Sequence, residues 1–582
     1  MIELLRLVIL TVLSFIVKSF NHVERVEHRT PHLKLCTLSG NSEVGRNCSF
    51  VEDRQNIILV DAGLSFPEQE IFGIDYLIPN LDYLQKNKQK VRAIFITHGH
   101  LDHIGALPFI LPLLGYPKVY AGSFASELIK QKLREFKILD KTRIIVVQRN
   151  TKIQIGRFTI SFIGVTHSIP HAFSVFIESA VGNIFFSGDF KIDETPANEQ
   201  QTDYETLRNL RGKVDLALIE STNSTSIGQS RSETQVSTTI EELLRSASGR
   251  VFVASFASQV SRLYVVSKIA SKLDKKVVLL GRSLKEAFRI AKELKYIDLP
   301  ESLFITPADF SKYPDNKIVI LCTGSQGEQF GALSLLSRGE NRFVKIKPGD
   351  RVILSSSEIP GNEYKIGRMT DMLIKLGCEL ITNKLDSVHA TGHGLQDDLK
   401  IMFELIQPKR VMPIHGTLTM RYFNKRNFLS WGMKSESIYL TDDGQVWEVN
   451  RERVTKAKPI ISKPVLIDAM GISDVGDVVL KDRETLAEYG MMCIVLNLSQ
   501  KNKHILGRIR FASRGFIYMN RSEQLLKELD RQITQIHKKW LDDSRETRKY
   551  EISLLRDSMS KHISKFLFKQ TKREPLIMVV IT

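Results

Sequence analysis

The 582 residues of the chain are enough for about three or four domains, and a hydrophobic content of 42% supports substantial cores. The five cysteines are scattered and never spaced as Cys-x-x-Cys, which argues against a disulfide framework or a zinc ribbon and for a reducing compartment. The 82 lysines and arginines outnumber 65 acidic residues and leave a net charge of +17. That excess suits a polyanionic partner such as nucleic acid, although a merely basic protein would have the same composition.

The first 30 residues form an apolar extension whose role the sequence leaves open. Residues 4–17 are largely apolar but too few to span a membrane comfortably. The extension also lacks the basic start and small-residue cleavage site of a signal peptide. The alternatives are a peripheral amphipathic anchor, a weak signal-anchor, or an upstream start codon that adds residues unrelated to the fold. We expect a cytoplasmic protein, with peripheral membrane association as an alternative.

Residues 97–103 read Thr-His-Gly-His-Leu-Asp-His and follow the apolar run 91–96, which predicts a buried strand. His98 and His100 can face one divalent ion, since such metals take nitrogen and oxygen ligands. Asp102 and His103 are offset far enough to reach a second ion. A polar loop that gathered its histidines by chance is the alternative, but the chain has only 14 histidines.

Other acidic or histidine side chains stand at the ends of strand-like runs: Asp61, His167, Asp189 and Glu220. Asp61 is placed to order the histidine loop, although an ordinary turn aspartate is an equally good interpretation. One such residue is usually structural. A series of them at the strand ends of an alternating α/β pattern points to an active centre, because functional residues of layered folds gather there.

Residues 223–380 have the pattern of a self-contained α/β unit. Cys-Thr-Gly-Ser-Gln-Gly-Glu at 322–328 and Ser-Ser-Ser-Glu-Ile-Pro-Gly-Asn-Glu at 355–363 each follow a strand-like run. Such loops expose backbone N–H groups that can hold a phosphate, although ordinary turns use the same residues. His389 and His393 come next, and His415 closes another strand-like run.

In this order the motifs resemble the metallo-β-lactamase superfamily, within it the β-CASP nucleases, and most closely the bacterial ribonuclease J family. The His-x-His-x-Asp-His motif is specific for the superfamily, and an acid with two later histidines narrows the resemblance to β-CASP. Three stretches are particularly like ribonuclease J: Thr-Gly-Ser-Gln-Gly-Glu at 323–328, Ile-Pro-Gly-Asn-Glu at 359–363 and Ser-Arg-Gly-Phe at 513–516. The similarity covers nearly the whole chain from Lys34 onward.

The resemblance implies an α/β fold, with a metallo-β-lactamase αββα sandwich, an inserted β-CASP α/β domain and a small α/β C-terminal domain. The expected parts are the extension 1–30, a discontinuous metallo-β-lactamase domain 31–222 and 381–450, the β-CASP domain 223–380, a basic linker 451–463 and the C-terminal domain 464–582. One long polar helix is expected over 522–568.

The resemblance also implies two divalent ions that serve the hydrolysis of RNA phosphodiesters. One ion would be held by His98, His100 and His167, the other by Asp102, His103 and His415, with Asp189 bridging them. His393, oriented or charge-balanced by Glu220, would be the general acid; alternatively, both only support the metal ligands. Nitrogen and oxygen ligands serve zinc, manganese and magnesium alike, and we expect zinc.

A pocket for a 5′-monophosphate belongs to the same resemblance, with candidate residues Ser325, Ser356, Ser357, His389 and His393. It implies a 5′-to-3′ exonuclease with endonuclease activity on single-stranded, 5′-monophosphorylated RNA, in mRNA decay and rRNA maturation. The expected partners are copies of the chain, as a homodimer or homotetramer through the C-terminal domain, and ribonuclease or helicase proteins.

Three positions depart from the family pattern. Thr417 stands where a glutamate is expected, Glu220 where most members have aspartate, and His171 where an acid is expected; none removes a metal ligand. Two other interpretations remain: a small-molecule metallohydrolase that shares only the metal core, and a catalytically weak RNA-binding partner subunit. The phosphate-type loops and the basic charge disfavour the first, and the complete ligand set disfavours the second.

Overall fold

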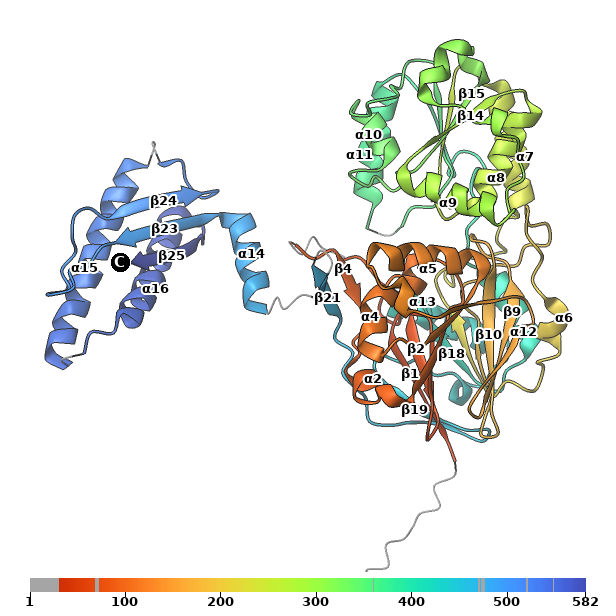
Figure 1. The fold of residues 1–582 in the computed structure, drawn as a ribbon, viewed down its shortest axis with the longest axis horizontal. Helices are drawn as coiled ribbons and strands as arrows, with labels where there is room; N and C mark the ends of the chain where they lie inside the picture. The colour runs from red at the N-terminus through yellow and green to blue at the C-terminus, as the bar shows by residue number, and fades with distance from the viewer. Residues whose placement is uncertain are drawn as a thin grey trace, which may run out of the picture. The chain divides into compact units, whose positions relative to one another are not determined.

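The structure is a computed structural model of the chain, and it describes residues 31–67, 73–359, 361–468, 471–472, 477–519, 522–547 and 549–582 (Figure 1). The expected extension 1–30 lies outside the described residues. The chain forms two compact units: one runs to Ser65 and continues over Ile78–Pro464, and the other contains Phe66–Leu77 and Val465–Thr582. Within the described part, no helix is both long enough and apolar enough to cross a membrane.

Two sheets packed face to face form the larger lobe of the first unit. The first sheet has eight strands, in the order β20 (Val454–Lys456), β19 (Val446–Val449), β1 (Leu33–Ser39), β2 (Cys48–Glu52), β3 (Ile57–Val60), β5 (Val91–Phe95), β6 (Lys118–Gly122) and β7 (Ile144–Val147). The second has six, in the order β18 (Val411–Ile414), β12 (Leu216–Glu220), β11 (Ile184–Phe186), β10 (Ala172–Glu178), β9 (Phe158–Val165) and β8 (Lys152–Ile155).

The facing sides of the two sheets share one buried core, in which Phe95 of the first sheet packs with Phe162 and Val175 of the second. Helices flank the first sheet: α2 (Asp82–Lys86), α4 (Leu107–Leu114) and α5 (Ser123–Glu135). Helices also pack on the second sheet: α6 (Tyr204–Arg208), α12 (Gln396–Ile406) and α13 (Leu418–Ser430). The expected αββα sandwich is therefore confirmed.

Neighbouring central strands in each sheet run parallel, so the polar residues that follow them lie at the same edge of that sheet. In the second sheet, β11 pairs with β12 and β12 with β18, so that Glu220 lies opposite Ile414. In the first sheet, β3 and β5 are parallel, and Val60 lies opposite Phe95. The residues that follow these strands therefore leave each sheet at the same end, which is where layered folds collect functional side chains.

The second lobe of the first unit is built on a five-stranded sheet whose neighbouring strands are all parallel. Its order is β14 (Lys276–Leu280), β15 (Ile318–Cys322), β13 (Val251–Ala254), β16 (Arg351–Leu354) and β17 (Glu379–Thr382). One face packs on α7 (Glu233–Ser246), α8 (Val260–Lys272) and α9 (Arg282–Glu293), and the other on α10 (Ala332–Ser337) and α11 (Glu363–Lys375). Both faces are buried, as expected for a parallel sheet. The expected inserted α/β domain is confirmed.

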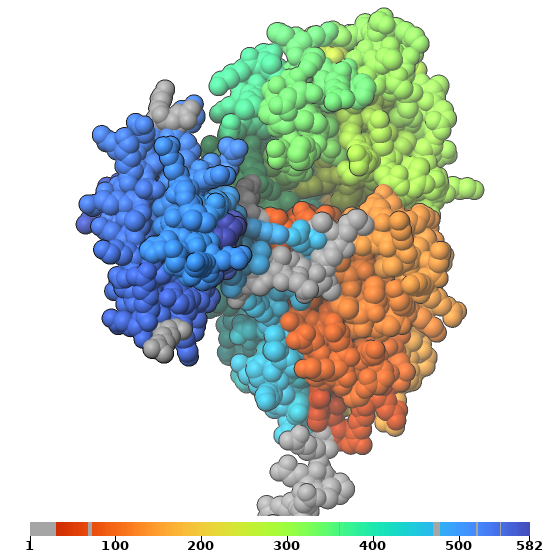
Figure 2. All heavy atoms as spheres, turned by 60° about the vertical axis from the view of Figure 1, so that its left-hand side comes forward, coloured from red at the N-terminus to blue at the C-terminus, as the bar shows by residue number. Residues whose placement is uncertain are grey.

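In Figure 2 this second lobe, in green, adjoins the orange part of the sandwich. Phe124 and Ile169 of the sandwich pack with Phe288 of α9 in one apolar cluster. A buried ion cluster also joins the lobes, because Nζ of Lys191 in the sandwich lies 3.7 Å from Oε1 of Glu233 on α7. Both kinds of contact hold the two lobes in one compact unit.

The second unit contains a three-stranded sheet of β24 (Arg510–Arg514), β23 (Met491–Leu496) and β25 (Leu576–Ile581), and the helices α14 (Asp477–Tyr489), α15 (Glu523–Thr547) and α16 (Ile552–Thr571). A small sheet comprises β22 (Gly471–Ile472), β21 (Val465–Asp468) and β4 (Tyr76–Ile78).

The expectation of one helix over 522–568 is wrong, because α15 and α16 are separate helices. Ile533 of α15 and Ile563 of α16 are buried in the same core with residues of the sheet. Two helices can turn both of their apolar stripes to that core, whereas one straight helix would leave one stripe in water.

Candidate metal centre

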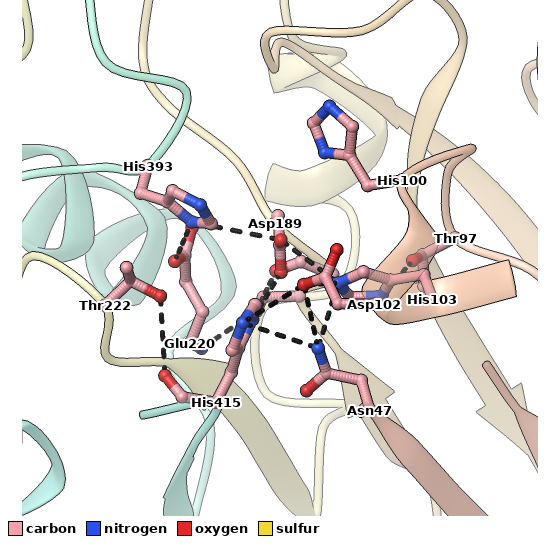
Figure 3. A network of polar contacts seen from close by, with 12 residues as sticks. Asn47, Thr97, His100, Asp102, His103, Asp189, Glu220, Thr222, His393 and His415 are labelled. Atoms are coloured by element: carbon pink, nitrogen blue, oxygen red, sulfur yellow. Dashed lines mark hydrogen bonds and ion pairs between the residues drawn. The ribbon is translucent and has the colours of Figure 1, made fainter. Parts of the chain in front are cut away.

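The side chains predicted as metal ligands meet at one end of the sandwich, where Figure 3 shows several of them turned toward one another. The loop after β5 carries His98 and His100, and the short helix α3 (Leu101–Ile104) carries Asp102 and His103. The other three follow strands: His167 after β9, Asp189 after β11 and His415 after β18. Segments far apart in the sequence thus supply one site.

One cluster consists of His98, His100 and His167. Nδ1 of His100 lies 3.0 Å from Nε2 of His98 and 3.1 Å from Nε2 of His167. Nitrogens that share one tetrahedral zinc-sized ion lie roughly 3.3 Å apart. His167 donates from Nδ1 to the carbonyl oxygen of Gly392 at 2.6 Å, which leaves the lone pair of Nε2 facing the cluster. Donor type and spacing therefore fit a divalent ion.

A second cluster consists of Asp102, His103, Asp189 and His415. Nε2 of His103 lies 3.3 Å from Oδ2 of Asp102 and 3.1 Å from Oδ2 of Asp189. Nδ1 of His415 lies 2.7 Å from Oδ1 of Asp189. Asp189 also faces the first cluster, because its Oδ2 lies 3.6 Å from Nε2 of His98. This carboxylate can therefore bridge two ions.

Asp61 lies behind the second cluster and holds its histidine in place. Oδ2 of Asp61 is 2.8 Å from Nδ1 of His103, and Oδ1 accepts a hydrogen bond from the backbone N–H of Thr97 at 2.8 Å. A carboxylate at Nδ1 keeps the proton of a neutral imidazole on that nitrogen and leaves Nε2 free to bind a metal.

The pKa values of two histidines in the first cluster, and of the shared Asp189, favour the protonation states that bind metals. Burial lowers the pKa of His100 to about 4. Burial, with His103 beside it, also holds the pKa of His98 well below its usual range. For Asp189, burial raises the pKa, but His415 and His103 outweigh this and keep the carboxyl ionised. Neutral imidazoles and ionised carboxylates are the forms that bind metals.

His103 differs, because its pKa is raised well above the usual range. Burial lowers it, but the carboxylates of Asp189, Asp102 and Asp61 outweigh burial. The cluster thus attracts a positive charge at this position. A divalent ion, which displaces protons from its ligands, would satisfy the same attraction.

His393 and Glu220 stand beside the two clusters. Nδ1 of His393 is 2.7 Å from Oε2 of Glu220 and 3.9 Å from Oδ2 of Asp189. The other oxygen of Glu220 accepts from the backbone N–H of Phe190 at 2.8 Å. Burial lowers the pKa of His393, but Glu220 and Asp189 outweigh it and raise the pKa to about 9. His393 therefore carries a proton at neutral pH. The spacing of His393, His167 and Asp189 would alternatively allow these three to hold an ion.

Of the predicted phosphate-binding residues, Ser325 follows β15, Ser356 and Ser357 follow β16, and His389 and His393 lie after β17. Oγ of Ser357 is 3.1 Å from Nε2 of His389, while Nδ1 of His389 is buried without a partner. Gln326 donates to Oγ of Ser356 at 3.3 Å, and its neighbour Ser325 is buried. Burial, then the charge of Arg262, lowers the pKa of His389 to about 3. Ser356, Ser357 and His389 are thus brought together by neighbouring loops.

Three neighbours of the site were missed from the sequence: Asn47, Arg262 and the carbonyl group of Gly392. Nδ2 of Asn47 lies 3.0 Å from Nε2 of His103. Arg262 donates to the carbonyl oxygen of Val388 at 2.7 Å, and so anchors the segment that carries His389 and His393. The varied, polar stretch 40–43 was a weak sequence signal for a functional loop before Asn47. A backbone carbonyl group leaves no signal in the sequence.

Two of the departures from the family pattern make ordinary structural contacts. Thr417 is the N-cap of α13, and its Oγ1 accepts from the backbone N–H of Met420 at 3.4 Å. His171 is exposed, and its Nδ1 lies 3.1 Å from Oγ of Ser123. These contacts are with residues of α13 and α5 rather than with the predicted metal ligands.

Three family models match the chain in separate segments. Residues 42–210 match the metallo-beta-lactamase superfamily, residues 248–373 the beta-CASP domain of ribonuclease J, and residues 478–582 the C-terminal domain of ribonuclease J. Among solved structures, a protein of unknown function from Enterococcus faecalis V583 has a TM-score of 0.52 at 16% identity, over 72% of this chain and all of that one. At this identity the likeness concerns the fold alone.

Similar sequences extend over nearly the whole chain. Ribonuclease J2 of Bacillus subtilis is 33% identical over 95% of this chain and 99% of the relative. Ribonuclease J 1 of Streptococcus pyogenes is 34% identical over 94% of this chain and 96% of the relative. Ribonuclease J 2 of Staphylococcus aureus strain MRSA252 is 33% identical over 96% of this chain and 99% of the relative.

Proposed function

Because the chain belongs to the ribonuclease J family of metal-dependent ribonucleases, we propose that it acts as a 5′-to-3′ exonuclease with endonuclease activity. Its substrate is single-stranded RNA, preferably with a 5′-monophosphate, in mRNA decay and rRNA maturation. The observation that carries the proposal is the position of Asp189 between two clusters of histidine and carboxylate ligands. The net charge of +17 also suits an RNA substrate.

Two divalent ions would be held by this chain's side chains. His98, His100 and His167 would hold one ion, Asp102, His103 and His415 would hold the other, and Asp189 would bridge them. When bound, the ions stabilise charge on the phosphate as Lewis acids and lower the pKa of the attacking water. Zinc is the proposed metal because imidazole suits it, with manganese or magnesium as alternatives.

His393 supplies the proton that the leaving 3′-oxygen needs. Its pKa of about 9 keeps the imidazole protonated at neutral pH, and its side chain is 23% exposed. Glu220 fixes the ring through Nδ1 and leaves Nε2 to face the substrate. A general acid in this position is worth about 10²–10⁴ in rate.

The proposed residues of the 5′-phosphate pocket are Ser325, Ser356, Ser357, His389 and His393. Support comes from the contact between Ser357 and His389, and from the unpartnered Nδ1 of His389. His389 lies four residues before His393, and four extended residues span at most ~14 Å. A phosphate held at His389 would therefore place the first phosphodiester within short reach of the ligand clusters, and cleavage would proceed from the 5′ end.

The remaining proposals concern organisation. The proposed parts are a metallo-β-lactamase domain over 31–222 and 381–450, a β-CASP domain over 223–380, a linker over 451–463 and a C-terminal domain over 464–582. That last domain would hold copies of the chain together as a homodimer or homotetramer. We also propose a cytoplasmic location and ribonuclease or helicase partners, as for an enzyme of RNA turnover.

The test is digestion of one single-stranded RNA, labelled at its 5′ end, with a monophosphate, a triphosphate or a hydroxyl at that end. The purified chain is assayed with zinc, manganese or chelator, beside its Asp189→Ala variant. Rapid release of labelled mononucleotide, fastest from the monophosphate, supports the proposal. Internal fragments regardless of the 5′ end would replace it with an endonuclease. RNA binding without cleavage under any metal would indicate a partner subunit.

A further inference from the structure

Asn47 extends into the second ligand cluster from the loop between β1 and β2 (Figure 3). Its Nδ2 lies 3.0 Å from Nε2 of His103, and 3.4 Å from both Nε2 of His415 and Oδ2 of Asp102. Those are one atom from each of the three side chains proposed to hold the second ion. The carboxamide of Asn47 therefore faces the proposed ion position at contact distance.

The backbone fixes Asn47 in this place. Its N–H donates to the carbonyl oxygen of Asp102 at 2.8 Å, and its carbonyl oxygen accepts from the N–H of Gly63 at 2.8 Å. Gly63 cannot carry a side chain, since a Cβ there would lie 1.6 Å from the carbonyl oxygen of Asp102. Asn47 and the ligand Asp102 are thus tied together through the main chain, and the carboxamide cannot drift far from the cluster.

A divalent ion would take the Nε2 lone pairs of His103 and His415, and the NH₂ group of Asn47 faces the same two nitrogens. An ion repels the N–H dipoles of the amide and attracts its oxygen. A half-turn about the Cβ–Cγ bond exchanges the amide oxygen and nitrogen in nearly the same space, and gives Asn47 an oxygen that faces the ligands. Carboxamide oxygens are hard ligands of the kind that manganese and magnesium take.

The opposite side of the carboxamide offers room for the displaced NH₂ group. Oδ1 of Asn47 lies against Gly40, where a Cβ would come within 2.6 Å of it. Gly40, Asn41 and Asn47 line a cavity of about 30 Å³ that also borders His103 and His415. Oδ1 of Asn41, on the wall of this cavity, is a buried acceptor without a partner. A cavity of this size holds about one or two waters that could bridge such groups.

We infer that Asn47 is a further ligand of the ion held by Asp102, His103 and His415, and that its carboxamide oxygen sets the metal preference of that position. The added oxygen raises the affinity of this position for manganese or magnesium, the alternatives to the proposed zinc, more than it raises the affinity for zinc, because zinc is satisfied by fewer, nitrogen-rich ligands. The inference rests on the proposed two-ion site.

The test compares the full-length chain with three variants. Asn47→Leu keeps the volume without the oxygen, Asn47→Asp keeps an oxygen at the same place and adds charge, and Asn41→Ala alters the same cavity without touching a ligand. Bound metal is counted by elemental analysis after gel filtration. Free manganese is measured by electron paramagnetic resonance during titration, and zinc affinity by competition with a chromogenic chelator. Circular dichroism monitors folding.

In Asn47→Leu we expect the manganese affinity of one of two positions to fall about tenfold or more, and zinc affinity to fall by less than about threefold. Asn47→Asp should bind manganese about tenfold more tightly, and Asn41→Ala, which removes only an acceptor beyond the carboxamide, should weaken manganese binding by less than about threefold. Unchanged manganese binding in both Asn47 variants would overturn the inference. If Asn47→Leu fails to fold, Asn47→Asp decides alone. An unmodified chain that binds fewer than two ions would refute the proposed site itself, and the inference with it.

Discussion

Nδ1 of His393 lies 2.7 Å from Oε2 of Glu220, so a fully buried carboxylate faces an imidazole whose side chain is 23% exposed. Burial lowers the pKa of this histidine, but Glu220 and then Asp189 raise it to about 9. The pair therefore keeps a proton at the border between the ligand clusters and solvent. That arrangement suits an acid that protonates a leaving group.

Glu220→Gln tests this assignment through the pH dependence of kcat. A general acid must be protonated, so the activity of the unmodified chain should fall as pH rises through about 9. The glutamine removes the charge that raises the pKa of His393, and the fall should move to lower pH. Rates are measured on 5′-monophosphorylated RNA across neutral and alkaline pH, with Glu127→Gln on α5 as the control. A lower kcat with an unmoved alkaline limb would mean that Glu220 and His393 only support the metal ligands.

Asp189→Ala tests the bridging position. Removal of the carboxylate shared by both clusters should lower hydrolysis at least a thousandfold, equivalent to about 4 kcal/mol of transition-state stabilisation. RNA binding, which depends mainly on basic side chains, should change less than about tenfold. Single-turnover rates and filter binding measure the two effects, with the exposed Asp140→Ala as the control. Normal turnover in Asp189→Ala would contradict the two-ion account.

Ser357→Ala tests the phosphate pocket. Loss of a hydrogen bond to a charged group costs about 1.5–3 kcal/mol, so kcat/KM for 5′-monophosphorylated RNA should fall about tenfold or more. RNA with a 5′-hydroxyl lacks that phosphate and should be cleaved almost as before. Ser357 is exposed, and Ser337→Ala, at a buried serine elsewhere in the same lobe, controls for a general loss of stability. Equal losses on both RNAs would remove Ser357 from the pocket.

Arg262→Met tests the buried ion cluster between the lobes. Nη2 of Arg262 lies 2.7 Å from Oε2 of Glu233, and both side chains are almost fully buried. Burial raises the pKa of Glu233, but Arg262 and Lys191 outweigh it and keep the group ionised. Without Arg262 this carboxylate loses its main partner, so unfolding should become easier by about 3–5 kcal/mol.

The control is Arg289→Met on α9, whose ion pairs with Glu286 and Glu293 are exposed. Its cost should stay below about 1 kcal/mol, because water screens exposed pairs. Chemical denaturation measures both variants. A cost for Arg262→Met no larger than that of the control would show that the cluster does not stabilise the junction.

Much of the candidate site could be predicted because its metal-binding groups are side chains whose types and spacing are visible in the sequence. His98, His100, Asp102 and His103 are dense in one short run, and His167, Asp189 and His415 each follow a strand. Strand periodicity and strand-end position are local signals, so an alternating α/β pattern was predictable from the residues, and the family resemblance then implied the αββα sandwich. The pairing of Glu220 with His393, 173 residues apart in sequence, needed the family resemblance as well.

The rest depended on three-dimensional packing. The carbonyl of Gly392 orients His167, but every residue has a carbonyl group. Asn47 lies in a turn-like stretch, where asparagine is common for unrelated reasons. The separate helices α15 and α16 were missed because their polar surfaces give one continuous pattern, and only the shared sheet explains the break.

Glu199→Gln tests whether a carboxyl group with a raised pKa lowers the stability of the folded chain at alkaline pH. The hydroxyl of Tyr296 donates to Oε1 of Glu199 at 2.9 Å. Burial is the largest influence on this carboxyl, and with Glu233 and Asp193 nearby it raises the pKa from 4.5 to about 8, despite the hydrogen bond from Tyr296 and the charge of Lys191. The folded chain thus retains a proton that the unfolded chain releases above pH 4.5. Stability from this group is present at acidic pH and is lost as pH rises to about 8.

Glutamine keeps the acceptor oxygen for Tyr296 and has no proton to lose. Glu199→Gln should therefore match the unmodified chain in Tm at acidic pH and exceed it at mildly alkaline pH. Thermal unfolding at both pH values measures the difference, and the exposed Glu194→Gln should show none. A Tm advantage that does not grow with pH would mean that Glu199 is already ionised in the folded chain. Its carboxylate would then be solvated or paired better than the contact with Tyr296 implies.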